Sequence, residues 1–382
     1  MTPRVLFVSN GHGEASIAGR IAEDVRAADA GAVLDHFPLV GTGLGGATMN
    51  EVGPRRSMPS GGLVAMGNVR AFARDVQAGF VGLFFAQLRF LREARGRYDA
   101  VVAVGDAYAL GLALTARAPV VFVGTAKSAY VAPYGPFERT LLRRAVDVFV
   151  RDERTVGELQ RSGVDAAAPG NVIVDLLRAD APALAGKWIG LLPGSRERAY
   201  EDGVRLARVL RALGERGEVR GILSVAPTLN AETFARALRD DGWDVRDGDD
   251  PQRLHLTCGG ATIVGWTGTL GALLRSCALV IGQAGTANEA AAACGIPVVV
   301  LDKDADLGAS WYRMRQRRLL GDALELVDAD PGRAAAAVEE LLNDPHRLDR
   351  MSACGVERMG GAGGAAAIAA RVVAVARGRA AA

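Results

Sequence analysis

Short runs of apolar residues alternate along the chain with segments whose apolar residues recur at helical spacing. Most runs are apolar at every position, which is typical of strands covered on both faces of a sheet. The predicted strands are 5–9, 33–37, 100–104, 120–124, 147–150, 188–192, 221–225, 278–282 and 297–301. The predicted helices include 17–28, 201–213, 231–239 and 286–294. Strands that alternate with helices predict parallel sheets in an α/β fold.

The same local pattern opens both halves of the chain. A strand, a glycine-containing turn and a helix follow one another in RVLFVSNGHGEAS from residue 4, and again in WIGLLPGSRER from residue 188. Because 382 residues exceed one ordinary core, we predict two doubly wound, Rossmann-like domains that face a cleft, residues 1–175 and 176–360. Residues 361–382 are predicted to form a terminal helix that packs locally or crosses back to the first domain.

Composition narrows the classes of function. The chain is 49% apolar and 23% charged with a net charge of +2, so we expect no nucleic-acid partner. The four histidines have no metal-ligand spacing, so we expect no metal site. The chain starts directly with a strand and has no window of 18 uncharged apolar residues. We therefore expect no signal peptide and no membrane-spanning helix.

One segment differs in character from the rest. Residues 58–97 carry six arginines against two acids, with interleaved Phe72, Phe80, Phe84, Phe85 and Phe90. A basic stretch rich in aromatics favours a membrane-surface element. The alternative is two ordinary domain helices whose aromatic side chains lie in the core.

Two turns in the second half are candidate anion sites, because small-residue turns that open helices leave backbone N–H groups free. The first turn contains Gly194, Ser195 and Arg196. We expect Ser195 to cap the helix and Arg196 to bind a diphosphate through two hydrogen bonds. The alternative is a plain capped helix with solvated arginines.

The second turn, GQAGTANEAAAACGIPVVV from residue 282, is a capping box by sequence, with Thr286 as the cap and Glu289 bonding back. The capping box does not explain the small residues that precede it. These residues end at Gly285 and leave room for a bound group. Gln283 would offer that group an amide. Glu289 suits a pair of sugar hydroxyls better than phosphate alone.

The N-terminal half offers two candidate proton acceptors. The turn SNGHGEAS lacks the G-x-G-x-x-G spacing of a nicotinamide site, and it places His12 and Glu14 at the mouth of the expected cleft. His12 is otherwise only a turn residue. Asp106 follows a buried strand and is a general base if burial raises its pKa. The alternative role of Asp106 is a helix N-cap.

Several motifs together resemble lipid-A-disaccharide synthase and, more closely, the lipid-A-disaccharide-synthase-related proteins. The shared motifs, spread over roughly residues 4 to 345, are GHGEAS, AVGDA, GTAKSAY, PFERTLLRR, FVRDERT, GNVIVDLL, LLPGSRER and GQAGTANEA. The resemblance implies the two-Rossmann GT-B glycosyltransferase fold, with the acceptor on the first domain and a nucleotide-sugar on the second. It implies that Asp106 is the base, that Arg196 contacts phosphate and that Glu289 binds the ribose.

The acceptor loop of the synthase is only partly kept. Gly13, Glu14 and Ser16 match its G-E-A-S-G-D motif, but Ile17 and Ala18 replace the last two residues. The resemblance assigns these three residues and Lys127 of the GTAKS motif to acceptor binding. Loss of the aspartate implies a different acceptor.

The sequence therefore predicts an inverting glycosyltransferase that needs no metal or cofactor. It would move a sugar from a UDP-sugar to a lipid-linked acceptor at the cytoplasmic face of the cell membrane, with Asp106 or His12 as the base. The alternatives are a nucleotide-sugar epimerase or hydrolase, and a non-catalytic protein that binds nucleotide-sugars.

Overall fold

The computed structural model describes residues 2–41, 48–56, 76–125, 127–177, 187–195, 197–247, 253–302 and 307–380. The chain divides into two compact units. Unit 1 comprises Met1–Leu176 with Ala362–Ala382, and unit 2 comprises Leu177–Gly361. Arg196 and residues 58–75 and 178–186 lie outside the described residues, as does the side chain of His12.

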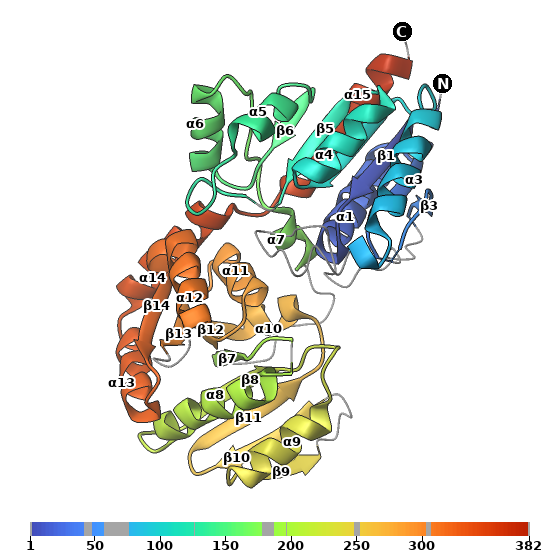
Figure 1. Ribbon diagram of the computed structural model, residues 1–382. Helices are drawn as coiled ribbons and strands as arrows, with labels where there is room; N and C mark the ends of the chain where they lie inside the picture. Colours follow the sequence, from blue (N-terminus) through green and yellow to red (C-terminus); the bar gives the residue numbers. More distant parts are fainter. Residues whose placement is uncertain are drawn as a thin grey trace. The chain divides into compact units, whose positions relative to one another are not determined.

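Unit 1 is built on a parallel sheet of order β3-β2-β1-β4-β5-β6 (Figure 1). Its strands are β1 (Arg4–Ser9), β2 (Val33–Pro38), β3 (Asn50–Glu51), β4 (Ala100–Gly105), β5 (Val120–Gly124) and β6 (Asp147–Phe149). The chain winds outward in one direction from β1 and in the other from β4. The carboxyl ends of these two neighbouring strands therefore form the topological switch point, where ligands of such sheets bind.

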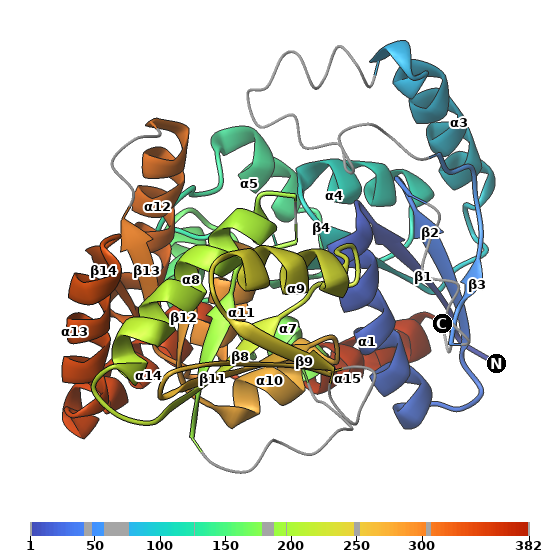
Figure 2. The same ribbon diagram turned by 90° about the horizontal axis from the view of Figure 1, so that it is seen from below.

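Helices cover both faces of this sheet. The helices are α1 (His12–Ala28), α3 (Phe80–Glu93), α4 (Ala107–Ala113), α5 (Pro136–Leu142), α6 (Glu153–Arg161), α7 (Val172–Leu176) and α15 (Gly364–Ala380). Alternate strand residues face opposite sides: Leu6 and Val8 join the core under α3 to α6, whereas Val5 and Phe7 join the core under α1, α7 and α15. Figure 2 shows α4 and α5 on one side of this sheet and α1 and α15 on the other.

The C-terminal helix α15 belongs to unit 1 and packs along α1. The Asp175 carboxylate accepts hydrogen bonds at 2.8 Å from the backbone N–H groups of Gly363 and Ala365, which satisfies donors at the start of α15. Farther along the helix, Arg371 pairs with Asp147 at 2.9 Å. By length and composition alone, one stretch of the described residues, Pro345–Gly378, is apolar enough to cross a membrane. This stretch covers both α14 and α15, and its α15 part supplies apolar residues to the core of unit 1.

Unit 2 has an eight-stranded sheet of order β14-β13-β12-β7-β8-β11-β10-β9. The strands are β7 (Trp188–Leu192), β8 (Val219–Ser224), β9 (Asp244–Asp247), β10 (Arg253–Cys258), β11 (Ala261–Trp266), β12 (Cys277–Gly282), β13 (Val298–Asp302) and β14 (Leu324–Asp328). The helices are α8 (Ala199–Gly214), α9 (Ala231–Asp240), α10 (Leu270–Ser276), α11 (Thr286–Ala293), α12 (Leu307–Leu320), α13 (Pro331–Leu342) and α14 (Pro345–Met359). The direction of winding reverses between β7 and β12, which places the switch point of unit 2 there.

The predicted parallel sheets are present, and one edge of unit 2 adds antiparallel pairs that the sequence did not predict. β10 pairs with both β9 and β11 in antiparallel fashion. The chain makes a tight glycine turn between β10 and β11, where Gly259 has φ +57°, so these strands are joined as a hairpin rather than through a helix.

A buried histidine lies beside the switch point of unit 1. His36 Nε2 is 2.9 Å from the hydroxyl oxygen of Ser9, and both side chains are buried. Burial lowers the pKa of His36 from 6.5 to about 4. Below pH 6.5, His36 is therefore protonated in the unfolded chain. In the folded chain it stays neutral until the pH falls to about 4.

This depressed pKa predicts pH-dependent stability. As the pH falls from 6.5 to 4, His36 is expected to remove up to about 3 kcal/mol of unfolding free energy. Denaturant unfolding of the wild type and His36→Gln at several pH values checks this, because the glutamine does not titrate. The difference in unfolding free energy between the two proteins should shift in favour of the variant as the pH falls. A pH-independent difference would contradict the assignment.

Candidate functional site

The switch point of unit 1 brings together residues that are far apart in the sequence. Asn10 follows β1 and Asp106 follows β4, and the Asn10 Nδ2 amide donates to Asp106 Oδ2 at 3.1 Å. Both residues lie at the carboxyl ends of adjacent parallel strands. The prediction that Asp106 would stand at this edge of the sheet follows from its place directly after a buried strand, and the structure places it there.

Asp106 is a helix N-cap whose two carboxylate oxygens have different environments. Oδ1 accepts from the backbone N–H groups of Tyr108 at 3.0 Å and Ala109 at 3.2 Å, whereas Oδ2 accepts from Asn10. Burial raises the pKa of Asp106, and the hydrogen bonds from Ala109 and Asn10 oppose that rise. The capping role is therefore present, and it uses only one oxygen. Oδ2 is the atom at which this carboxylate can take up a proton.

A second acid, Glu14, lies against the same strand end. A Cβ added at Gly105 would lie 3.3 Å from Glu14 Cγ, and Gly105 has φ +132°, so this position requires glycine. The Thr125 hydroxyl after β5 donates to Glu14 Oε1 at 3.4 Å. Burial and then the nearby charge of Asp106 raise the pKa of Glu14. Two carboxyl groups with raised pKa values thus share this edge.

The other predicted residues of the N-terminal loop lie in the first turns of α1. His12 is the first residue of the helix rather than part of the preceding turn, and its side chain lies outside the described residues. Gly13 is exposed, and an added Cβ would meet nothing within 4 Å among the described atoms. Ser16 is partly buried one turn further along. Among the described acceptor residues, Glu14 lies at the strand end with Asn10 and Asp106, and these three residues are called the Asp106 cluster below.

Lys127 has structural partners. Its ammonium group pairs with Glu138 at 2.6 Å and donates to the Pro133 carbonyl at 3.4 Å. Glu138 also accepts from the Gly135 N–H at the start of α5, at 2.7 Å. Lys127 therefore fixes the segment between β5 and α5, and the structure does not join it to the Asp106 cluster.

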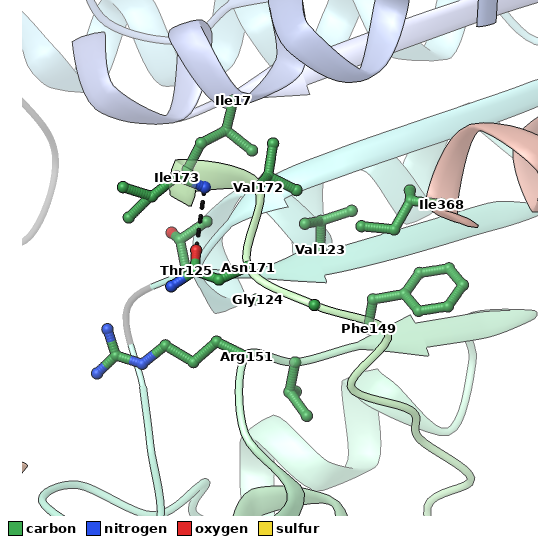
Figure 3. A pocket seen from close by; sticks show the side chains of 12 residues that line it. Ile17, Val123, Gly124, Thr125, Phe149, Arg151, Asn171, Val172, Ile173 and Ile368 are labelled. Carbon is green, nitrogen blue, oxygen red and sulfur yellow. Dashed lines mark hydrogen bonds between the residues drawn. The ribbon is translucent and has the colours of Figure 1, made fainter. Parts of the chain in front are cut away.

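A small cavity of about 30 Å³ opens next to Thr125 (Figure 3). Its walls come from β5, β6, α1, α15 and the segment before α7, and include Ile17, Val123, Phe149, Arg151, Asn171 and Ile368. Figure 3 shows the Arg151 side chain extending away from Phe149 and Ile368. The cavity has room for a water or methyl-sized group.

The switch point of unit 2 brings the two predicted anion turns side by side. The backbone N–H groups of Gln283 and Ala284, after β12, donate to the carbonyl of Leu192, the last residue of β7, at 2.9 and 3.2 Å. Gly194 has φ +111°, and an added Cβ would contact the Ala284 backbone at 4.0 Å. The turn after β7 and the turn before α11 therefore form one surface at the carboxyl edge of the sheet.

Two of the predicted helix caps are wrong. Helix α8 begins at Ala199 with Arg198 as its N-cap, so Ser195 lies four residues before the helix. Ser195 is exposed, and its carbonyl accepts from the Thr228 hydroxyl at 2.9 Å. In α11 the N-cap is Gly285, which makes Thr286 the first helical residue. The capping box is thus displaced by one residue.

This displacement changes the interpretation of Glu289. It lies at the fourth helical position of α11, partly buried, rather than at the third position that a capping box requires. Gly285 offers the first-turn N–H groups of α11 no side chain. The start of α11 therefore has no side-chain cap among the described residues, and one acid lies a turn further on.

Buried amides hold the turn before α11 in place. Gln283 donates through Nε2 to the Leu301 carbonyl at 3.1 Å, so the predicted ligand amide is already engaged in the sheet. Gln316 of α12 donates to the carbonyls of Ala284 and Gly285 at 3.3 and 3.1 Å, and it accepts from Asn288 at 3.3 Å. A side chain at Gly282 would overlap Asn288. Sequence reasoning missed Asn288 and Gln316, because nothing in the local sequence indicates that these polar side chains are buried.

The sequence prediction also missed the turn after β11. Because β11 is parallel to β8, its carboxyl end lies at the same edge as the two anion turns. There the Trp266 indole N–H donates to the Thr269 carbonyl at 2.9 Å, and the Thr269 hydroxyl caps α10. The signal was a strand, Ala261–Trp266, that ends in a glycine and threonine turn like the other two.

Comparisons with known proteins identify the fold through solved structures rather than through sequence. No family model matches the chain, and no curated protein matches it by sequence. Solved structures match over nearly the whole length. MurG of Acinetobacter baumannii aligns with a TM-score of 0.58 at 15% identity, covering 97% of this chain and 99% of that one. A Neisseria meningitidis UDP-GlcNAc 2-epimerase bound to UDP-GlcNAc aligns with a TM-score of 0.57 at 13% identity, covering 97% and 99%.

The glycosyltransferase SnogD of Streptomyces nogalater gives a TM-score of 0.52 at 17% identity, covering 98% of this chain and 100% of that one. These identities are too low to carry a reaction or a residue role across. They agree with the observed architecture of two Rossmann-like units, each with its own switch point. The chain therefore has the GT-B fold, which these glycosyltransferases and epimerases share.

Proposed function

We propose that the chain is an inverting glycosyltransferase that moves a sugar from a UDP-sugar to a hydroxyl of a lipid-linked acceptor. The observation that carries the proposal is Asp106, a buried carboxylate with a raised pKa at the switch point of unit 1. A carboxylate with this environment is suited to remove a proton from an acceptor hydroxyl near neutral pH.

The donor is assigned to the switch point of unit 2. The turn containing Gly194 and the start of α11 support binding of a diphosphate, because backbone donors and a helix N-terminus favour negative charge. Glu289 would accept hydrogen bonds from the two ribose hydroxyls of the nucleotide. Arg196, in the first turn, would pair with the diphosphate as UDP leaves. These groups stabilise the leaving charge without a metal ion.

The reaction follows from these assignments. The acceptor oxygen attacks the anomeric carbon from the side opposite UDP, which inverts that carbon. Asp106 Oδ2 takes the hydroxyl proton, the bond from the sugar to UDP breaks, and the electron pair leaves on the diphosphate. The proton then passes from Asp106 to solvent.

The lipid nature of the acceptor is inferred from α3. Leu83, Gln87 and Leu91 bury one side of this helix, whereas Val81 and Phe85 are 50% and 61% exposed on another side. Arg89 and Arg92 follow them at helical spacing and are also exposed. An apolar stripe that continues into arginines suits the surface of an anionic membrane. We therefore propose that the protein acts at the inner face of the cell membrane.

This assignment predicts that Phe85→Ser weakens binding to vesicles of phosphatidylglycerol and phosphatidylcholine by about tenfold, because the lipid contact loses one aromatic side chain. Vesicle sedimentation measures the effect. Met314→Ser is the matched control, since Met314 is 54% exposed on α12 of unit 2. Equal binding by the wild type and Phe85→Ser would show that the exposed side of α3 does not contact the membrane.

One observation favours a second function, a nucleotide-sugar epimerase. Glu14 and Asp106 are neighbouring acids with raised pKa values. Such a pair can hold one proton between them and act as acid and base in turn. Several UDP-GlcNAc 2-epimerases share the fold. The exposed stripe of α3 has no role in that reaction, which is why the transferase is preferred.

The test incubates the purified chain with radiolabelled UDP-GlcNAc, UDP-glucose and UDP-galactose, with and without vesicles made from a bacterial total-lipid extract. A transferase releases UDP and labels the lipid phase only when vesicles are present, and it does so equally in EDTA. An epimerase converts UDP-GlcNAc to its 2-epimer without lipid, which proton NMR detects. Nucleotide-sugar binding with neither product would support the non-catalytic alternative.

A further inference from the structure

Asn10 has a polar atom that the fold leaves unsatisfied. The residue is 3% exposed, and its Nδ2 amide donates to Asp106 Oδ2 at 3.1 Å. Its Oδ1 atom is buried and has no hydrogen-bond partner among the described residues. A buried carbonyl oxygen without a partner costs about 1–3 kcal/mol, so such atoms in folded proteins call for an explanation.

The described neighbours of Asn10 explain why none of them donates to its Oδ1 atom. A Cβ added at Gly105 would lie 3.7 Å from Asn10 Cβ and 3.3 Å from Glu14 Cγ, so both side chains lie over the same strand end. Glu14 and Asp106 only accept hydrogen bonds when ionised. The Thr125 hydroxyl already donates to Glu14. Among the described side chains, this cluster thus contains more acceptors than donors.

A ligand that brings hydroxyl groups would correct this excess. We propose that the Asn10 carboxamide is a recognition group that binds the acceptor through Oδ1 while it orients Asp106 through Nδ2. The hydrogen bond between Asn10 and Asp106 holds two acceptor atoms, Asn10 Oδ1 and Asp106 Oδ2, on one pair of side chains. Two adjacent hydroxyls can reach both atoms, so the group recognised by Asn10 is a hydroxyl vicinal to the one that Asp106 deprotonates. The acceptor is therefore a vicinal diol, such as a sugar ring or glycerol headgroup. This inference rests on the proposed acceptor role of unit 1.

The first experiment compares two probes that differ by one hydroxyl. Glycerol monobutyl ether carries a vicinal diol, and propylene glycol monobutyl ether carries a single hydroxyl. Each is titrated into the full chain while NMR follows the side-chain amide signals of Asn10. We expect the diol to bind about tenfold more tightly, as one added hydrogen bond to a buried acceptor provides. Equal affinities, or no shift of the Asn10 signals with either probe, would overturn the proposal and leave a buried water as the partner of Oδ1.

The second experiment separates recognition from folding. In Asn10→Ala the preference for the diol should disappear. The pKa of Asp106, followed by carbon-13 NMR of its carboxyl group, should rise further because a hydrogen bond to the carboxylate is lost. Asn50→Ala is the matched control, since Asn50 donates to another carboxylate, Asp35, at 3.2 Å in the same unit. A diol preference that persists in Asn10→Ala, or an unchanged Asp106 pKa, would contradict the assignment.

These measurements use neither a nucleotide-sugar nor a transfer reaction. Their outcome can therefore contradict the role of Asn10 without contradicting the proposed function. Should Asn10→Ala not fold, the comparison of the two probes on the wild type still decides the proposal. A chain that prefers the diol but transfers no sugar would keep Asn10 as a hydroxyl-recognition group and overturn the transferase. A transferase without diol preference would do the reverse.

Discussion

Asp106→Asn is expected to slow glycosyl transfer by about 10²- to 10⁴-fold, the usual contribution of a general base. The fold and the affinity for UDP should remain unchanged. Asparagine is as good an N-cap as aspartate, so Oδ1 can still accept from Tyr108 and Ala109. What the substitution removes is the ability of Oδ2 to accept a proton.

The pH dependence provides an independent sign of the same role. Because burial raises the pKa of Asp106, the rate should fall on the acid side at a higher pH than for an ordinary aspartate. The residual rate of Asp106→Asn should lack this acid limb. Asp106→Ala is the comparison variant, since it also loses the cap and should cost about 1 kcal/mol of stability. Transfer by Asp106→Asn at a rate near the wild type would show that Asp106 is only a cap.

Glu289→Ala is expected to weaken UDP binding by about 10- to 100-fold, which corresponds to losing charge-assisted hydrogen bonds to the ribose hydroxyls. The prediction follows from the position of Glu289 one turn into α11, beyond the register of a capping box. Isothermal titration with UDP, together with a thermal melt, separates the two roles. Lowered stability with unchanged UDP affinity would assign Glu289 to the structure of the helix.

A matched control for Glu289 exists in the same unit. Glu232 is also an acid in the first turn of a helix, α9, whose cap is the Asn230 side chain. Glu232→Ala should leave UDP binding unchanged, because the loss of a first-turn acid by itself affects only helix stability. A similar loss of affinity in both variants would point to a general effect on unit 2 rather than to a ribose contact.

The strands that hold both switch points could be predicted from the sequence. Val120–Gly124 and Trp188–Leu192 match their predicted bounds, and the other predicted strands differ by one or two residues at their ends. Buried parallel strands are continuous apolar runs, which makes them conspicuous. The edge strands β9 and β10 were missed because neither Asp244–Asp247 nor Arg253–Cys258 is a continuous apolar run.

The site was predicted as a set of turns rather than as a set of contacts. Asp106 and Glu14 were recognisable because acids directly after strands or at helix starts carry a local signal. Asn10 and Gln316 carry none. Their roles depend on partners 96 and 28 to 32 positions away, Asp106 for the first and the α11 turn with Asn288 for the second. The register of α11 was wrong by one residue because a Gly-Thr pair permits either residue to be the cap.

The central claim is that the switch point of unit 2 binds the nucleotide of a UDP-sugar. Isothermal titration of the full chain with UDP tests it most directly, with GDP as the control for the base. We expect saturable UDP binding with a Kd below about 1 mM, which corresponds to a binding free energy of more than 4 kcal/mol, and weaker binding of GDP. The absence of any saturable heat with millimolar UDP would contradict it.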